Sequence, residues 1–359
     1  FIMKRGLDMD SKYDVIVIGA GNGGLVSALE LVKSGKKVLV LESGNMPGGM
    51  ATSFVRGRFE FEVSLHALCE YGNLENPGKT YKLFEKLGIG DKVNFVTVPE
   101  AFHVYAMDQN VDYKMPFGIA EFVEKMEEYV PKSRESMKKF FFLAEECQEA
   151  LTYMEENKGY IDQNYVKKNF PNFLKVSMHT VDKVFDSLKM PKRTQEILST
   201  YWVYLGSSTS KLSFVHFSSM VFSYISKGAQ IPYKKSHEIS LVLADEIEKL
   251  GGEIKYFATV KEILFKDKKI AGVLLKNGDI YETNHVISNV SPTFVYGNML
   301  PSPMVPKEAV KLTNSRVLGA RGFSIFLGLN QSAKDLGLED YSYFICENLD
   351  SNKEYQNKS

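Results

Sequence analysis

The chain has 359 residues, of which 44% are hydrophobic and 25% are charged, as is usual for a globular protein of two or three domains. Lysine and arginine together number 44, and so do aspartate and glutamate, so the formal net charge is zero. No overall positive field would attract nucleic acid, and we expect no nucleic-acid partner.

Cysteine usage and apolar stretches bear on location. Cys69, Cys147 and Cys346 are far apart and fit no metal-ligand spacing, so we expect no metal site and the reduced thiols of a cytoplasmic protein. Residues 1–10 are polar and do not predict a signal peptide. No run approaches the ~18 apolar residues of a spanning helix, which leaves peripheral contact with a membrane as an open alternative.

The strongest pattern is a strand followed by a glycine-rich turn and a helix. Residues 15–18, Val-Ile-Val-Ile, predict a strand buried on both faces, as in a parallel sheet. Gly19, Gly21 and Gly24 then form a G-x-G-x-x-G pattern that leads into a predicted helix over 23–34. In a dinucleotide-binding turn, these glycines permit the tight turn, the approach of the pyrophosphate and the close packing of helix on strand.

A second strand is predicted over 38–41, and Glu42 follows at its end. The carboxylate comes roughly 20 residues after the glycines, where it can accept hydrogen bonds from a ribose diol. An acidic residue here favours FAD or NAD over NADP, because the 2′-phosphate of NADP would repel it. The chain should therefore begin with a dinucleotide-binding βαβ unit of a doubly wound α/β fold.

The residues after this unit separate FAD from NAD. Pro47-Gly48-Gly49 follows the second strand closely, where a simple NAD domain would continue into another helix. Together with the run 14–42, this element resembles the flavoprotein family of phytoene desaturases, carotene cis-trans isomerases and retinol saturases, and more distantly the amine oxidases. The resemblance extends from residue 13 to about residue 330 and implies FAD as the cofactor.

The resemblance also implies which residues bind FAD. In the later part of the chain, the residue matching Val260 would offer backbone hydrogen bonds to the adenine ring. The expected cofactor-binding residues are Gly19, Gly21, Asn22, Gly23, Gly24, Glu42, Ser43, Gly48, Gly49, Met50, Ala51, Val260 and Asn289.

One histidine is a catalytic candidate. Residues 59–66 resemble the segment that approaches the isoalloxazine ring in the saturase and isomerase branches, although Ser64 stands where a glycine is common. His66 would then lie near the flavin and could orient substrate or donate a proton. A packed structural histidine is the alternative.

The expected architecture is a discontinuous FAD-binding domain with an inserted α+β substrate domain. In the later FAD-binding segment, a helix over 241–250 precedes two alternating strands that flank Asn277-Gly278, which is typical of a type I′ hairpin. We place the FAD-binding domain at 1–75 and 236–293, and the substrate domain at 76–235 and 294–359.

The substrate region combines short strands with helices. Strands are expected near 93–98, 102–107 and 111–115, and again over 322–329. Helices are expected between 119 and 156 with a break at Pro131. The apolar run 140–143 within them could line a tunnel or a membrane-dipping face for a long lipid, or form an ordinary helical core.

Further features depart from the family pattern. Met50 stands where desaturases often carry a basic residue, which favours another branch. The family also has a late Gly-Asp motif that closes the flavin site, and none occurs before Ser359. We therefore expect a further C-terminal segment or a partner chain to complete the site.

These observations predict an FAD-dependent oxidoreductase that desaturates, saturates or isomerises C–C and C=C bonds of an apolar isoprenoid, carotenoid-like or lipid substrate by hydride exchange with flavin N5. Two alternatives stay open. One is an amine-oxidase-like flavoprotein, and the other is a flavin-binding subunit that is active only with a partner chain.

Overall fold

The computed structural model describes residues 12–65, 67–72, 77–316, 319 and 322–358. The chain divides into two compact units. The first unit contains the described parts of 1–65, 82–96 and 232–317, and the second contains those of 66–81, 97–231 and 318–359.

Three segments that we expected in the substrate domain lie in the first unit, namely 82–96, 232–235 and the described part of 294–317, whereas the described part of 66–75, expected in the FAD-binding domain, lies in the second unit. Long-range polar contacts bind the first of them. Lys33 donates to the carbonyl of Lys86 at 2.6 Å, and Lys92 forms an ion pair with Glu246 at 2.7 Å. Such contacts depend on the fold, so no local pattern in the sequence reveals them.

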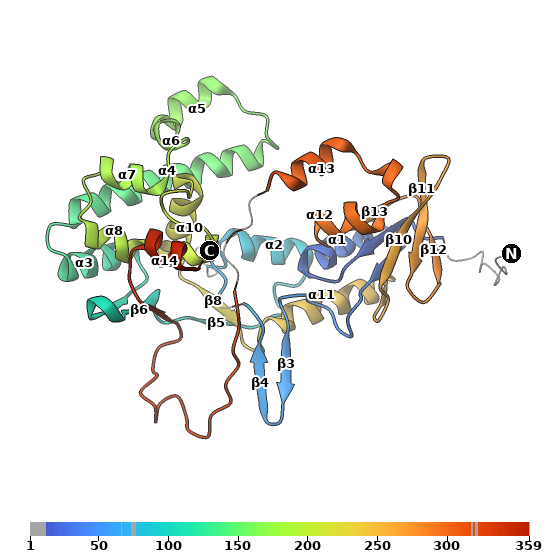
Figure 1. Ribbon diagram of the computed structural model, residues 1–359, viewed down its shortest axis with the longest axis horizontal. Helices are drawn as coiled ribbons and strands as arrows, with labels where there is room; N and C mark the ends of the chain where they lie inside the picture. Colours follow the sequence, from blue (N-terminus) through green and yellow to red (C-terminus); the bar gives the residue numbers. More distant parts are fainter. Residues whose placement is uncertain (1–11, 66, 73–76, 317–318, 320–321, 359) are drawn as a thin grey trace. The chain divides into compact units, whose positions relative to one another are not determined.

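A parallel four-stranded sheet is central to the first unit (Figure 1). All residues of its strands β1 and β2 are buried, which explains their continuous apolar runs. Both strands are confirmed at the predicted bounds. The strand order is β13 (Val286–Ser288), β1 (Val15–Ile18), β2 (Val38–Leu41) and β9 (Glu253–Lys255).

The two faces of this sheet are covered differently. Helix α1 (Asn22–Lys33) contacts β1 and β2 and packs against α11 (His237–Lys249). Ile16 and Ile18 of β1, with Leu39 and Leu41 of β2, share a core with a small antiparallel sheet. The unit is therefore layered α/β, as expected. The antiparallel sheet consists of β10 (Val260–Lys266), β11 (Lys269–Leu275) and β12 (Ile280–Glu282).

The two hairpins of the antiparallel sheet use different turns. Between β10 and β11, Asp267 and Lys268 both have positive φ angles, 51° and 60°, as a type I′ turn requires. The type I′ prediction at Asn277-Gly278 is wrong, because only Gly278 has a positive φ, 95°. There, Leu275 pairs with Asp279 across a three-residue loop, which accommodates a different turn.

The remaining elements of the first unit are short. β3 (Ser53–Arg56) and β4 (Phe59–Glu62) form a separate two-stranded hairpin. The later part of the unit contains α12 (Pro292–Phe294), the π-turn η3 (Val295–Met299), the 3₁₀-turn η4 (Ser302–Met304) and α13 (Lys307–Asn314). The elements at the boundaries between the units are α2 (Lys79–Leu87), β5 (Phe95–Thr97) and β8 (Gln230–Pro232).

The second unit is a helical body with a three-stranded sheet. The sheet order is β14 (Tyr343–Cys346), β6 (Phe102–Ala106) and β7 (Val111–Met115), and the 3₁₀-turn η1 (Met107–Gln109) joins the last two strands. Its helices are α3 (Ile119–Tyr129), α4 (Arg134–Glu156), α5 (Gln163–Asn169), α6 (Pro171–Val176), α7 (Val181–Ser187), α8 (Lys192–Leu198), η2 (Ser199–Tyr201), α9 (Trp202–Leu205), α10 (Phe214–Lys227) and α14 (Ser351–Lys358).

The core of the second unit is rich in aromatic side chains. α4 packs on α10, and Phe140 lies edge-to-face with Phe185 and Phe214. Phe140 and Phe141 are buried, so the helical-core interpretation of this run is confirmed for them, whereas Phe142 is 60% exposed. The predicted helical break is also confirmed, since α3 ends at Tyr129 and α4 begins at Arg134.

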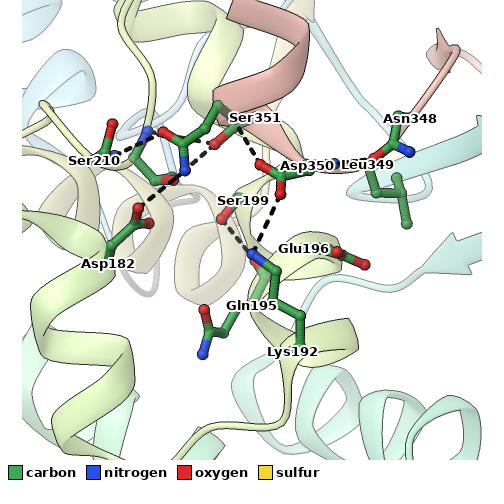
Figure 2. A network of polar contacts seen from close by, with 12 residues as sticks. Asp182, Lys192, Gln195, Glu196, Ser199, Ser210, Asn348, Leu349, Asp350 and Ser351 are labelled. Carbon is green, nitrogen blue, oxygen red and sulfur yellow. Dashed lines mark hydrogen bonds and ion pairs between the residues drawn. The ribbon is translucent and has the colours of Figure 1, made fainter.

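The last described residues are anchored to the second unit by polar contacts (Figure 2). Ser351, at the start of α14, is buried and hydrogen-bonds to the Thr209 hydroxyl at 2.7 Å. Asn352 donates to Asp182 at 3.0 Å. The predicted strand over 322–329 is wrong, because these residues form no strand and pair with none of the strands described here.

Candidate cofactor site

A cavity of about 610 Å³ opens in the first unit at the carboxyl ends of β1 and β2. Ligands of doubly wound sheets bind at this edge, because the loops that follow the strands leave a crevice there. Eleven of the thirteen expected cofactor-binding residues line the cavity, and the other two, Gly23 and Gly24, lie in the first turn of α1. The lining residues are Ile18, Gly19, Gly21, Asn22, Leu41, Glu42, Ser43, Gly48, Gly49, Met50, Ala51, Ala258, Thr259, Val260, Asn289, Val290, Phe294 and Met299.

The glycine-rich turn has the geometry that its sequence predicts. Gly19 has a φ of 95°, which disfavours any residue with a side chain. A Cβ on Gly24 would lie 2.0 Å from the carbonyl oxygen of Gly19, so only glycine allows α1 to pack this closely on β1. A Cβ on Gly21 would meet only the side-chain amide of Asn289, at 2.9 Å. The backbone at Gly21 is therefore open to a ligand wherever that amide can move.

The second glycine pair lies directly against the first turn. The Gly48 amide donates to the Ala20 carbonyl at 2.7 Å, and Gly48 and Gly49 have φ angles of 117° and 61°. The Ser240 hydroxyl of α11 contacts both Asn22 and the Ala51 carbonyl at 2.9 Å. This second backbone segment therefore lies against the first turn and lines the same pocket.

Glu42 connects the strand ends to both loops. Its carboxylate accepts hydrogen bonds from the amides of Ala20 at 2.8 Å and Gly44 at 2.7 Å, and from the Ser43 hydroxyl at 3.2 Å. A carboxylate has roughly four acceptor positions, so capacity remains for a ribose hydroxyl. The same side chain would thus both stabilise the glycine-rich turn and bind the ribose.

The later segment completes the cavity wall. Val260 is buried at the start of β10, and the Ala258 amide donates to the Glu42 carbonyl at 2.8 Å. Asn289 follows β13, its amide donates to the Ile18 carbonyl at 2.8 Å, and its side chain covers the glycine-rich turn. Whether these residues contact the cofactor stays a prediction.

Sequence reasoning missed several apolar lining residues. Ile18 and Leu41 could have been found, because they end the two strands whose carboxyl edge forms the site. Phe294 and Met299 follow β13 after Pro292, outside the expected FAD-binding segment, and carry no recognisable pattern.

His66, the catalytic candidate, lies outside the described residues. Nearby in the second unit, the Tyr224 hydroxyl donates to the Ala67 carbonyl at 3.1 Å. Burial raises the pKa of the Cys69 thiol to about 11, so this cysteine is a neutral thiol at physiological pH and no nucleophile. Within the described parts of the chain, no group of three acidic, histidine or cysteine side chains could hold a metal ion.

A profile of the family described as flavin containing amine oxidoreductase matches residues 23–338, which is most of the chain. The chain belongs to this family. Its cofactor is FAD, and the cavity fits that group, since two glycine turns leave room for a pyrophosphate and a carboxylate lies at the ribose position.

Proteins of known function extend the comparison. All-trans-retinol 13,14-reductase of Danio rerio is 27% identical over 381 residues, covering 96% of this chain and 59% of that protein. Chloroplastic prolycopene isomerase of Daucus carota is 26% identical over 357 residues, covering 97% of this chain and 57% of that protein. The chain therefore spans less than two thirds of the length of these relatives.

Solved structures share the fold. Putrescine oxidase with bound putrescine has a TM-score of 0.61 at 15% identity, covering 86% of this chain and 64% of that one. An oxidoreductase from Methanosarcina mazei has a TM-score of 0.56 at 18% identity, covering 84% and 65%. At such identities the likeness concerns the fold alone. None of the helices described for this flavoprotein is both long and apolar enough to cross a membrane.

Proposed function

We propose that this chain is the FAD-binding part of an oxidoreductase that saturates, desaturates or isomerises carbon–carbon bonds of an apolar isoprenoid or carotenoid-like substrate. The similarity to retinol reductase and prolycopene isomerase over 96% and 97% of the chain carries the proposal. The two relatives are named for different reactions of conjugated polyenes, so the similarity supports the substrate class more strongly than the direction of the reaction.

The contribution of the protein begins with holding the dinucleotide. When bound, FAD supplies a hydride acceptor or donor at its N5 atom. Gly21 and Gly49 would admit the pyrophosphate to the backbone, and Glu42 would accept hydrogen bonds from the ribose hydroxyls. The apolar side chains of Ile18, Leu41 and Val260 exclude water from the wall of the cavity.

The test is anaerobic and uses the FAD-loaded protein. After photoreduction, all-trans-retinol or a poly-cis carotene is added, and the flavin spectrum and polyene products are followed. We expect the polyene to reoxidise the flavin, or to isomerise only while the flavin is reduced. A protein that holds FAD yet leaves every polyene unchanged with both reduced and oxidised flavin would contradict the proposed substrate class, since desaturation needs the oxidised flavin as hydride acceptor.

Amine oxidation is the second candidate, since the family profile carries that description and putrescine oxidase shares the fold. In that case, putrescine or another primary amine should bleach the oxidised flavin without light, and oxygen should restore it. If amines bleached the flavin and polyenes had no effect, amine oxidation would become the preferred function.

Whether a further segment or a partner chain is needed is a separate question, which a measurement of FAD binding can answer. In equilibrium dialysis, the folded protein alone could bind FAD weakly and without saturation. If a second polypeptide then restored tight binding, the subunit alternative would be supported. Tight binding by this chain alone would contradict it.

We also propose a cytoplasmic location. Cys69 and Cys147 are free thiols, and Cys147 is buried in the core, as in proteins of reducing compartments. Fractionation of cells that express the native gene would test this, and recovery from an oxidising compartment would contradict it.

A further inference from the structure

A second cavity, of about 390 Å³, lies in the second unit among α4, α6 and α7. Its apolar wall is formed by Leu143 of α4, Val176 of α6 and Val184 of α7. We call it the basic cavity, because Lys175, His179 and Lys183 also line it and none of the described lining residues is acidic.

The lysines of the basic cavity have no acidic partner among the described residues. Lys175 donates only to the side-chain carbonyl of Asn172, at a long 3.4 Å, and no ion pair involves Lys183. Two unpaired ammonium groups at one apolar hollow would repel each other, and an anion between them would remove that repulsion.

The neighbouring carboxylates are engaged elsewhere. Glu146 of α4 accepts from the Asn172 side chain at 2.7 Å and from the Phe173 amide at 2.9 Å. On α7, Asp182 accepts from Asn352, and Figure 2 shows it directed toward Ser210 and Ser351. Neither these carboxylates nor Asp186 of α7, which accepts from the Gln195 side chain at 3.4 Å, line the cavity or form an ion pair with its lysines, so the charges of the described lining are those of Lys175 and Lys183.

Three large apolar side chains that are open to solvent are sequence neighbours of residues that line the basic cavity. Phe142, Leu174 and Met178 are 60%, 42% and 90% exposed, and each precedes a lining residue in the sequence. The segment 157–189, which contains Leu174 and Met178, has six lysines against three aspartates, although the whole chain is neutral. Exposed apolar groups beside unpaired lysines are typical of a surface that contacts anionic lipid.

We propose that the basic cavity binds the phosphate of an anionic phospholipid in a bilayer, while Phe142, Leu174 and Met178 enter the boundary of the acyl chains. A water-soluble phosphate would need the lysines but not the exposed apolar groups, so the combination favours a lipid surface. This assignment is independent of the flavin site, because all of its residues belong to the second unit.

The test is sedimentation of the purified protein with vesicles. Phosphatidylcholine vesicles should bind little, and vesicles with about 30% phosphatidylglycerol should bind strongly and lose the protein as salt rises. The double variant Lys175→Gln/Lys183→Gln should lower partitioning about 30-fold, because each lysine near an anionic surface contributes roughly fivefold. Leu174→Ser/Met178→Ser should also weaken binding, but without changing its salt dependence.

A charge-matched control is Lys261→Gln/Lys276→Gln, which removes two exposed lysines from the first unit and should change partitioning less than about threefold. Equal binding by the Lys175/Lys183 variant and wild type would overturn the proposal. A second result would also overturn it: glycerol phosphate stabilises the wild-type protein against heat but not the Lys175/Lys183 variant, and vesicles do not bind. The ligand would then be a soluble phosphate.

Discussion

Replacement of Gly24 by alanine should loosen the packing of α1 on β1. The added Cβ would lie 2.0 Å from the Gly19 carbonyl oxygen and 3.2 Å from its carbonyl carbon. These are backbone atoms, so no side-chain rotation relieves the overlap and the helix must move away by about 1 Å. Overpacking of this kind costs about 1–3 kcal/mol, and the better helix propensity of alanine returns at most about 1 kcal/mol. We expect a net loss of about 1–2 kcal/mol in the free energy of unfolding.

Urea unfolding of the FAD-free protein, followed by circular dichroism, measures this loss. Gly23→Ala is the matched control, because its Cβ would meet only the side chain of Asn289, at 2.9 Å, which can rotate. Its free energy of unfolding should equal that of wild type or exceed it by up to about 1 kcal/mol, from the better helix propensity of alanine. If Gly24→Ala unfolded at the wild-type midpoint, the proposed close contact of helix and strand would be refuted.

Three further predictions concern other charged and backbone positions. Glu42→Gln should weaken FAD binding about 10- to 100-fold in equilibrium titration, since a hydrogen bond to a charged group contributes about 1.5–3 kcal/mol. Lys268→Gly should raise the free energy of unfolding by about 0.5–1 kcal/mol, because Lys268 has a φ of 60° in its turn. In the second unit, burial opposes ionisation of Asp340, but hydrogen bonds from Lys114 and His103 outweigh it and lower its pKa. This group therefore stabilises the fold above its ordinary pKa of about 4, and the advantage of wild type over Asp340→Asn in urea should shrink as pH falls below that value.

The sequence could predict the part of the site whose geometry is local. β1, the glycine turn, α1 and β2 are consecutive, and their periodicity and glycine spacing determine their structure. The contact between Asn289 and this turn joins residues about 270 positions apart and depends on how β13 pairs with β1. No pattern within a single segment could reveal it.

The errors have physical causes as well. Asn277-Gly278 favours a type I′ turn, but the register of β11 with β12 leaves a three-residue loop there. Residues 322–329 have the composition of a strand, yet a strand needs a hydrogen-bonded neighbour, and none pairs with them in the described structure. Local composition cannot supply that neighbour.

FAD titration of wild type and Gly21→Ala tests the central claim most directly. Gly21 has a φ of −69°, which alanine also adopts, and its Cβ would meet only the movable amide of Asn289, so the variant should fold. The methyl group would nevertheless occupy the approach to the pyrophosphate. We predict saturable FAD binding by wild type and at least about 100-fold weaker binding by Gly21→Ala, because exclusion of a phosphate from its backbone contacts should cost about 3 kcal/mol of binding free energy. The FAD-free proteins should have equal urea midpoints. Equal FAD affinity in the two proteins would contradict the assignment of this cavity as the flavin site.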